Sequence, residues 1–294
     1  MTDTSTINDP VKRVGVIGAG LMGSGIAEVA ARAGLDVVVV EASDRLAADG
    51  RARVEKSLGR AEQAGKLTPA ELTASVDRLR FTAQMDQLAD RDLVVEAIVE
   101  DEAAKVATFR AIDGVVGDTT IMASNTSSIP IMKLAMATRR PENVIGIHFF
   151  NPVPVLHLVE LVTSLYTSEE TTQRAEAFST GQLGKRAIHS KDRAGFIVNA
   201  LLIPYVLSAI RMFESGFASM EDIDNGMVTG CAHPMGPLAL ADLIGLDTTM
   251  AVADSLYDEF REQLYAPPPL LARMVEAGLL GRKTGRGFYD YGSR

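Results

Sequence analysis

Short apolar runs rich in β-branched residues alternate with longer amphipathic stretches from residue 13 to about residue 150. The clearest run contains four consecutive valines, which is typical of a strand covered on both faces. The pattern predicts strands at 13–17, 36–40, 93–98, 121–124 and 143–149, and helices at 22–33, 44–64 and 102–112. This alternation predicts βαβ units and therefore an α/β domain with a mostly parallel sheet.

The pattern changes near residue 190. Residues 195–216 are apolar almost all round, which predicts a helix buried in a core or a subunit interface, and Pro204 within it predicts a kink. The remaining sequence is helical in character and is interrupted by Gly and Pro. We place the domain boundary between about 188 and 195, which gives an α/β domain over 1–190 and an all-α domain over 191–294.

Composition excludes several classes of protein. The 294 residues carry a net charge of −9, which does not favour nucleic-acid binding. Cys231 is the only cysteine, so an internal disulfide and a Cys-cluster metal site are both impossible, and we expect no metal. The first ten residues lack a signal-peptide pattern, and no stretch is apolar enough to span a membrane. We expect a cytoplasmic protein that does not bind membranes.

A glycine-rich turn joins the first predicted strand to the first predicted helix. Its sequence, GAGLMG, matches the GxGxxG pattern of dinucleotide-binding domains. Gly18 permits the tight turn, Gly20 lets the backbone approach a pyrophosphate, and Gly23 lets helix and strand pack closely. The pyrophosphate would lie on the helix N-terminus, at Leu21 and Met22. The motif in this context predicts a Rossmann-like domain.

Glu41 ends the second predicted strand, 23 residues after Gly18. A carboxylate at this place accepts hydrogen bonds from ribose hydroxyls and repels a 2′-phosphate, so we predict NAD rather than NADP. FAD, which uses the same motif, is one alternative. A glycine-rich turn beside a surface glutamate is the other.

His148 ends a predicted strand of the first domain, and histidine titrates near neutral pH, which suits general base catalysis. A hairpin centred on Pro154 would place Glu160 opposite His148, with Cβ atoms about 4.5–5.5 Å apart. A turn centred earlier would pair His148 with His157 or Leu158 instead. The sequence leaves these registers open.

Two further groups could contact a substrate. Ser127 and Asn199 could each donate a hydrogen bond to a substrate oxygen, although SNTSS is also good turn or N-cap sequence. Arg53, Lys56 and Arg60 share one face of a predicted helix and could hold phosphates. A solvated helix face explains these charges equally well.

Three other candidates have weaker support for a functional role. Cys231 and His233 could be imagined as a nucleophile pair, but we interpret the cysteine as a small hydrophobic residue. His189 and Asp242 are interpreted as structural.

The segments GAGLMG, SNTSS, HFFNPVP, LVE and KDRAGFIVN, with MGPLALADLIGLDTT and GRKTGRGFYDY, resemble the L-3-hydroxyacyl-CoA dehydrogenases. The resemblance covers nearly the whole chain. It implies an NAD-dependent oxidoreductase of fatty acid metabolism that transfers a hydride to or from C3 of a short-chain acyl-CoA, such as 3-hydroxybutyryl-CoA. It also implies an NAD-binding first domain, a helical substrate and dimerisation domain, and a homodimer.

The same resemblance assigns roles to individual residues. It implies that His148 is the general base with Glu160 as its partner, and that Ser127 and Asn199 contact the substrate. The other implied contacts are, for NAD, Glu41, Ala97, Glu100, Lys105, Asn125, Asn151 and Lys283, and, for CoA, Ser57 beside Lys56 and Arg60.

The sequence departs from this family at three positions. Ala194 stands where many members have Pro, Ala200 where many have Arg, and His157 where relatives often have Lys. The first two leave the acyl-chain preference open. The rival functions are a gulonate-type sugar-acid dehydrogenase of the same fold and a non-enzymatic NAD-binding protein.

Overall fold

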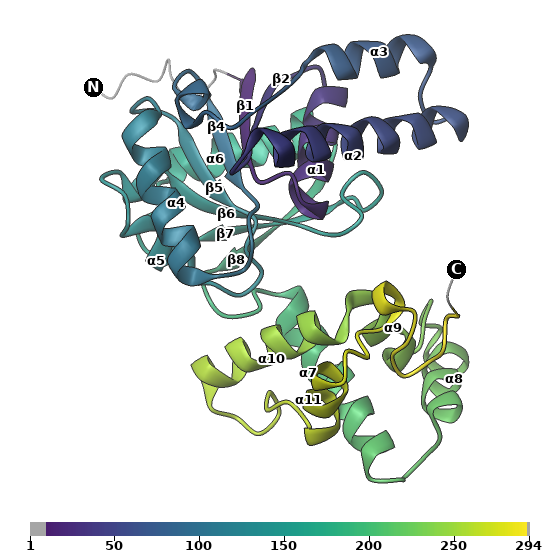
Figure 1. The fold of residues 1–294 in the computed structure, drawn as a ribbon. Coiled ribbons are helices and arrows are strands. Elements are labelled where there is room, and N and C mark those ends of the chain that lie inside the picture. The colour runs from purple at the N-terminus through teal and green to yellow at the C-terminus, as the bar shows by residue number, and fades with distance from the viewer. Residues whose placement is uncertain (1–9, 293–294) are drawn as a thin grey trace. The chain divides into compact units, whose positions relative to one another are not determined.

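The computed structural model describes residues 10–292 and divides into two compact units between Arg193 and Ala194 (Figure 1). This division lies within the range in which the sequence pattern changes. The N-terminal stretch examined for a signal peptide lies, up to residue 9, outside the described residues. Among residues 10–292, no helix combines the length and apolar character needed to cross a bilayer.

The first unit is built on one eight-stranded sheet with the order β3-β2-β1-β4-β5-β6-β7-β8. Its strands are β1 (Arg13–Ile17), β2 (Asp36–Val40), β3 (Leu79–Thr82), β4 (Leu93–Glu96), β5 (Ile121–Ser124), β6 (Val144–Phe149), β7 (Leu158–Thr163) and β8 (Arg186–Lys191). All neighbours are parallel except β6 and β7, which form an antiparallel hairpin. The predicted Rossmann-like, mostly parallel sheet is confirmed.

Helices connect the strands of this unit. They are α1 (Leu21–Arg32), α2 (Asp44–Gln63), α3 (Pro69–Asp77), α4 (Glu102–Val115), α5 (Ile131–Ala135) and α6 (Glu169–Glu176), with short helices η1 (Met85–Leu88), η2 (Pro141–Asn143) and η3 (Ala177–Gln182). Two N-terminal caps set where helices begin. Ser43 accepts a hydrogen bond at the start of α2, and Asp101 does so at the start of α4.

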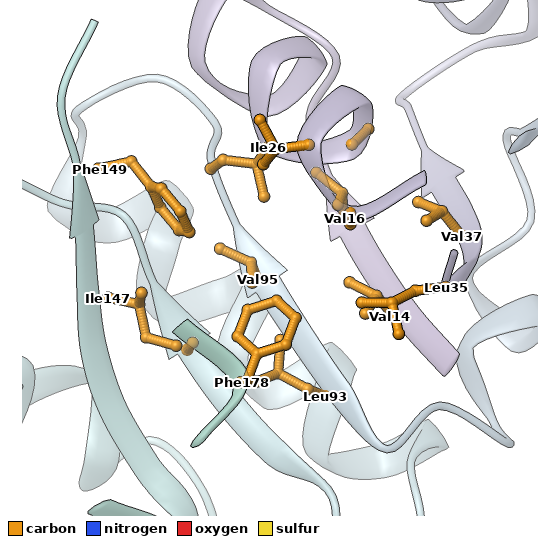
Figure 2. Packing of buried hydrophobic residues seen from close by; sticks show 14 of the residues in the cluster. Val14, Val16, Ile26, Leu35, Val37, Leu93, Val95, Ile147, Phe149 and Phe178 are labelled. Atoms are coloured by element: carbon orange, nitrogen blue, oxygen red, sulfur yellow. The ribbon is translucent and has the colours of Figure 1, made fainter. Parts of the chain in front are cut away.

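The core of the first unit lies between the sheet and its helices. Figure 2 shows Val16 of β1 near Ile26 of α1, Val14 of β1 near Leu35, and Phe178 of η3 near Leu93 of β4. These side chains are almost fully buried. Each stabilises the fold by about 1.5–3 kcal/mol relative to an exposed position. This packing fixes the strand ends on which the candidate site is built.

The second unit is all-α, as the sequence predicts. Its helices are α7 (Val198–Glu214), α8 (Met220–Cys231), α9 (Pro237–Ile244), α10 (Leu246–Phe260) and α11 (Pro269–Glu276), followed by the short η4 (Arg282–Thr284). Helix α7 runs through Pro204, and the kink stays a prediction. Val206 and Ile210 of α7 are buried in the core, whereas Leu201 is 73% exposed and Met212 is 41% exposed. The helix is therefore not buried all round within the chain.

A buried carboxylate fastens the end of this unit. Asp242 of α9 is 1% exposed and accepts hydrogen bonds from the backbone N–H groups of Phe288 and Tyr289, each at 2.9 Å. The Tyr291 hydroxyl donates a third at 3.0 Å. This is the kind of structural role that was expected for Asp242.

Candidate active site

The glycine-rich turn between β1 and α1 has the geometry that its sequence predicts. Gly18 has a φ of +92°, and a Cβ atom there would lie 2.6 Å from the Ala97 carbonyl oxygen. A Cβ atom at Gly23 would lie 1.8 Å from the Gly18 carbonyl oxygen. By contrast, a Cβ atom at Gly20 would meet nothing within 4 Å, so the space beside this residue is open. The turn thus fits a dinucleotide pyrophosphate at the N-terminus of α1.

Two charged side chains hold the peptide groups of Ala19, inside this turn. Glu41, directly after β2, accepts a hydrogen bond from the Ala19 N–H at 2.6 Å, and Arg53 of α2 donates to the Ala19 carbonyl. Arg53 therefore has a structural contact with the turn. Arg53, Lys56 and Arg60 are all exposed on α2, Ser57 is half-buried, and the phosphate-holding face stays a prediction.

The β6–β7 hairpin resolves the register that the sequence left open. His148 is paired with Glu160, and its Nδ1 lies 2.7 Å from Glu160 Oε2. The alternative pairings with His157 and Leu158 do not occur. His148 is 6% exposed and Glu160 is fully buried. A neutral imidazole that donates from Nδ1 presents Nε2 as its acceptor, which is the arrangement that a general base requires.

The segment 124–128, here called the serine loop, begins at the last residue of β5 and is organised by Glu100. Glu100 Oε1 accepts from the Thr126 hydroxyl at 2.6 Å and from the N–H groups of Ser127 and Ser128 at 2.9 and 3.1 Å. Burial by itself would raise the pKa of Glu100, but the Lys105 ammonium and the loop's hydrogen-bond donors outweigh it. The pKa of Glu100 is therefore held below its ordinary value of 4.5.

Sequence reasoning missed Glu96, the last residue of β4. It is fully buried and accepts hydrogen bonds from Lys105 Nζ at 2.6 Å and from Ser124 Oγ at 2.7 Å. Lys105 is 1% exposed and also lies 3.2 Å from Glu100, so its buried ammonium joins the buried Glu96 to the more exposed Glu100. The available signal was an acidic residue inside the apolar run LVVEAIV.

Asn125 connects the serine loop to the strand that carries His148. Its Oδ1 accepts a hydrogen bond from the N–H of Phe149 at 2.9 Å. Ala97 follows β4, and its N–H donates to the Ile17 carbonyl at 2.8 Å. Because β1, β4, β5 and β6 are parallel neighbours, their carboxyl ends meet at one edge of the sheet. The structure thus brings together the glycine-rich turn, the serine loop and His148.

Asn151 is exposed in the β6–β7 connection, two residues after the end of β6. Asn199 and Lys283 belong to the helical unit. Asn199 is half-buried at the start of α7, and Lys283 forms an ion pair with Asp247. Their roles beside a coenzyme or substrate stay predictions. The departures at positions 194 and 200 also lie in this unit.

The remaining candidates have other partners. His233 Nδ1 lies 3.1 Å from the Tyr205 hydroxyl, and Cys231 is exposed at the end of α8. His189 Nε2 lies 3.5 Å from Glu176, with both side chains about half exposed. Within residues 10–292, no group of three His, Cys, Asp or Glu side chains is arranged to hold a metal ion.

Comparisons with known proteins place both units. Residues 13–193 match the family described as "3-hydroxyacyl-CoA dehydrogenase, NAD binding domain", and residues 195–291 match the corresponding C-terminal domain. A 3-hydroxybutyryl-CoA dehydrogenase of Mycobacterium tuberculosis is 57% identical over 97% of this chain and 100% of its own length. The human mitochondrial hydroxyacyl-coenzyme A dehydrogenase is 43% identical over 96% of this chain and 91% of its own.

Solved structures agree with this. The crystal structure of M. tuberculosis FadB2 has a TM-score of 0.96 at 57% identity, covering 97% of this chain and 100% of that one. The (S)-3-hydroxybutyryl-CoA dehydrogenase PaaH1 of Ralstonia eutropha has a TM-score of 0.92 at 49% identity, covering 96% and 100%.

Proposed function

Since this chain belongs to the 3-hydroxyacyl-CoA dehydrogenase family, we propose that it interconverts a short-chain L-3-hydroxyacyl-CoA and its 3-keto form with NAD, and that 3-hydroxybutyryl-CoA and acetoacetyl-CoA are its substrates. The observation that carries the proposal is the buried pair of His148 and Glu160, 2.7 Å apart. It lies at the sheet edge that also bears the glycine-rich turn. The names of the relatives over the full chain support the substrate.

In the direction of oxidation, His148 Nε2 accepts the proton of the 3-hydroxyl group while the C–H bond at C3 gives up its hydride. NAD, when bound, supplies the hydride acceptor. Glu160 holds the Nδ1–H and stabilises the imidazolium that forms. In the direction of reduction, the imidazolium returns the proton to the oxygen as the hydride arrives at C3.

The residues around the turn fit NAD. The open space beside Gly20 supports a pyrophosphate at this place, and Glu41, which is hydrogen bonded to the turn at Ala19, is proposed to bind ribose hydroxyls. The wider set of proposed coenzyme contacts comprises Gly18, Leu21, Met22, Gly23, Ala97, Glu100, Lys105, Asn125, Asn151 and Lys283.

Ser127 and Asn199 are proposed to contact the acyl thioester. Lys56 and Arg60, with Ser57 between them, are proposed to hold the CoA phosphates, because they remain exposed on α2.

A homodimer through the helical unit is proposed on the exposed apolar side chains of that unit. Leu201 and Met212 of α7 are exposed, and Phe217 just beyond this helix is 77% exposed. We also propose a cytoplasmic location, because one exposed cysteine suits a reducing compartment. Sedimentation of wild type and Leu201→Glu tests the dimer, which the variant should weaken.

The direct test of activity mixes the protein with NADH and acetoacetyl-CoA and follows the loss of NADH absorbance. Longer 3-ketoacyl-CoAs then define the chain length. The gulonate-type alternative is tested with NAD and a sugar acid, and it is not favoured because both domains match the acyl-CoA family. Turnover of the sugar acid alone would overturn the proposal, and turnover of neither would leave an NAD-binding protein.

A further inference from the structure

We propose that Glu96 is a positioning residue for the serine loop and, through this loop, for the acyl-CoA substrate. Glu96 is fully buried at the end of β4, so we expect it to act through its neighbours rather than by touching the substrate. A buried carboxylate is costly unless it is paired and hydrogen bonded. Lys105 Nζ, Ser124 Oγ and the Ile98 N–H donate hydrogen bonds to Glu96 at 2.6, 2.7 and 2.8 Å.

The first route from Glu96 to the loop is direct. Ser124 Oγ donates to Glu96 Oε2 and accepts from the N–H of Thr126 at 3.2 Å. The carboxylate thus fixes the orientation of the Ser124 hydroxyl, and this hydroxyl holds the first turn of the loop.

The second route runs through Lys105. Its buried ammonium lies between the two carboxylates, 2.6 Å from Glu96 and 3.2 Å from Glu100. Glu100 in turn holds the loop from Thr126 to Ser128. If Glu96 lost its charge, Glu100 would be the one carboxylate left at the ammonium among residues 10–292. We expect the position of Glu100 beside the loop to change as a result. Both routes therefore set where Ser127 lies.

The test compares two buried glutamates. Glu96→Gln keeps the shape of the side chain and removes its charge. Glu28→Gln is the matched control, because Glu28 is 1% exposed on α1 and pairs with Arg32 rather than with the serine loop. Hydrogen exchange of the amides of residues 126–128 should be faster in Glu96→Gln and unchanged in Glu28→Gln. This measurement does not depend on the reaction.

The kinetic part rests on the proposed function. We expect kcat/KM for acetoacetyl-CoA to fall about tenfold in Glu96→Gln, because small displacements of positioning groups have effects of this size, and less than about twofold in the control. If Glu96 acts through Ser127, the loss should shrink to under about twofold when Glu96→Gln is added to Ser127→Ala.

Should Glu96→Gln fail to fold, Ser124→Ala removes the direct route alone and should give the same exchange pattern. Unchanged loop exchange in the folded variant, or a kinetic loss that multiplies fully with that of Ser127→Ala, would overturn the proposal. Lack of turnover by the wild type would instead contradict the proposed function. Hydrogen exchange of the loop amides would still decide the role of Glu96.

Discussion

Glu160 and Glu96 are both fully buried carboxylates on strands of one sheet, yet they have different partners. Glu160 lies 2.7 Å from an imidazole, and Glu96 lies 2.6 Å from an ammonium. An imidazole can act as a general base, whereas the Lys105 ammonium makes ion pairs with two carboxylates. The pair of His148 and Glu160 suits proton transfer, and the pair of Lys105 and Glu96 suits holding the serine loop in position. Burial alone does not distinguish the two roles, but the partner does.

The largest effect should follow from removing the imidazole. His148→Gln is expected to lower kcat by at least about 10²-fold, because a positioned general base contributes that much. Steady-state kinetics with acetoacetyl-CoA and NADH measure this, and NADH binding should be nearly unchanged. His189→Gln is the matched control, since His189 also pairs with a glutamate but is half exposed. If the His148 variant keeps most of its kcat, His148 is not the general base, and its pair with Glu160 does not serve proton transfer.

Neutralising the partner should have the next largest effect. Glu160→Gln is expected to lower kcat by about 10- to 100-fold, because the imidazolium loses its carboxylate. Combined with His148→Gln, it should add almost nothing, since the two residues work as one unit. Glu176→Gln, which alters the exposed histidine–glutamate pair, should leave kcat unchanged. Losses that multiply in the double variant would show that Glu160 does not act through His148.

Exposed cations should behave differently from both buried pairs. Lys56→Ala with Arg60→Ala is expected to raise KM for the CoA thioester about fivefold with little change in kcat, because exposed charges contribute modestly to binding. The rise should disappear with a truncated thioester that lacks the nucleotide, and it should shrink at high salt. An equal rise for both thioesters would mean that these cations do not hold phosphates.

The smallest effect concerns stability and pH. The pKa of Glu100 is lowered, so its stabilising contribution is complete above the ordinary value of 4.5 and is lost as the pH falls through the lower, folded value. Glu100→Gln should therefore lower Tm by about 2–4 °C at neutral pH, and the difference from wild type should narrow in acid. Calorimetry over a pH series measures this. Glu102→Gln, at an exposed ion pair, serves as the control, and a Tm difference for Glu100→Gln that does not change with pH would contradict the prediction.

Local sequence patterns were enough to predict the elements whose structure depends on a few neighbouring residues. The valine run gave β2, and the glycine spacing gave the turn before α1, because both depend on a few neighbouring residues. Strands β3 and β8 escaped prediction. They are edge strands with mixed or exposed side chains, so they lack an apolar run.

The Glu96 network could not be read from the sequence for a different reason. Its residues come from β4, α4 and β5, and they meet only because β4 and β5 are adjacent in the sheet. The hairpin pairing of His148 with Glu160 was one of several possible registers, and the structure was needed to choose it. Arg53 was placed on a helix face correctly, but its contact with Ala19 depends on how α2 packs over the turn.

Asp242 sets a limit on how far the protein can be shortened. Ending the chain before Phe288 would remove three hydrogen-bond donors to Asp242 at once. Its carboxylate would then be buried in the helical unit without these partners. Trimming that looks harmless on a sequence would then act like a core mutation. Anyone attaching a reporter or an affinity handle should keep these last aromatic residues intact.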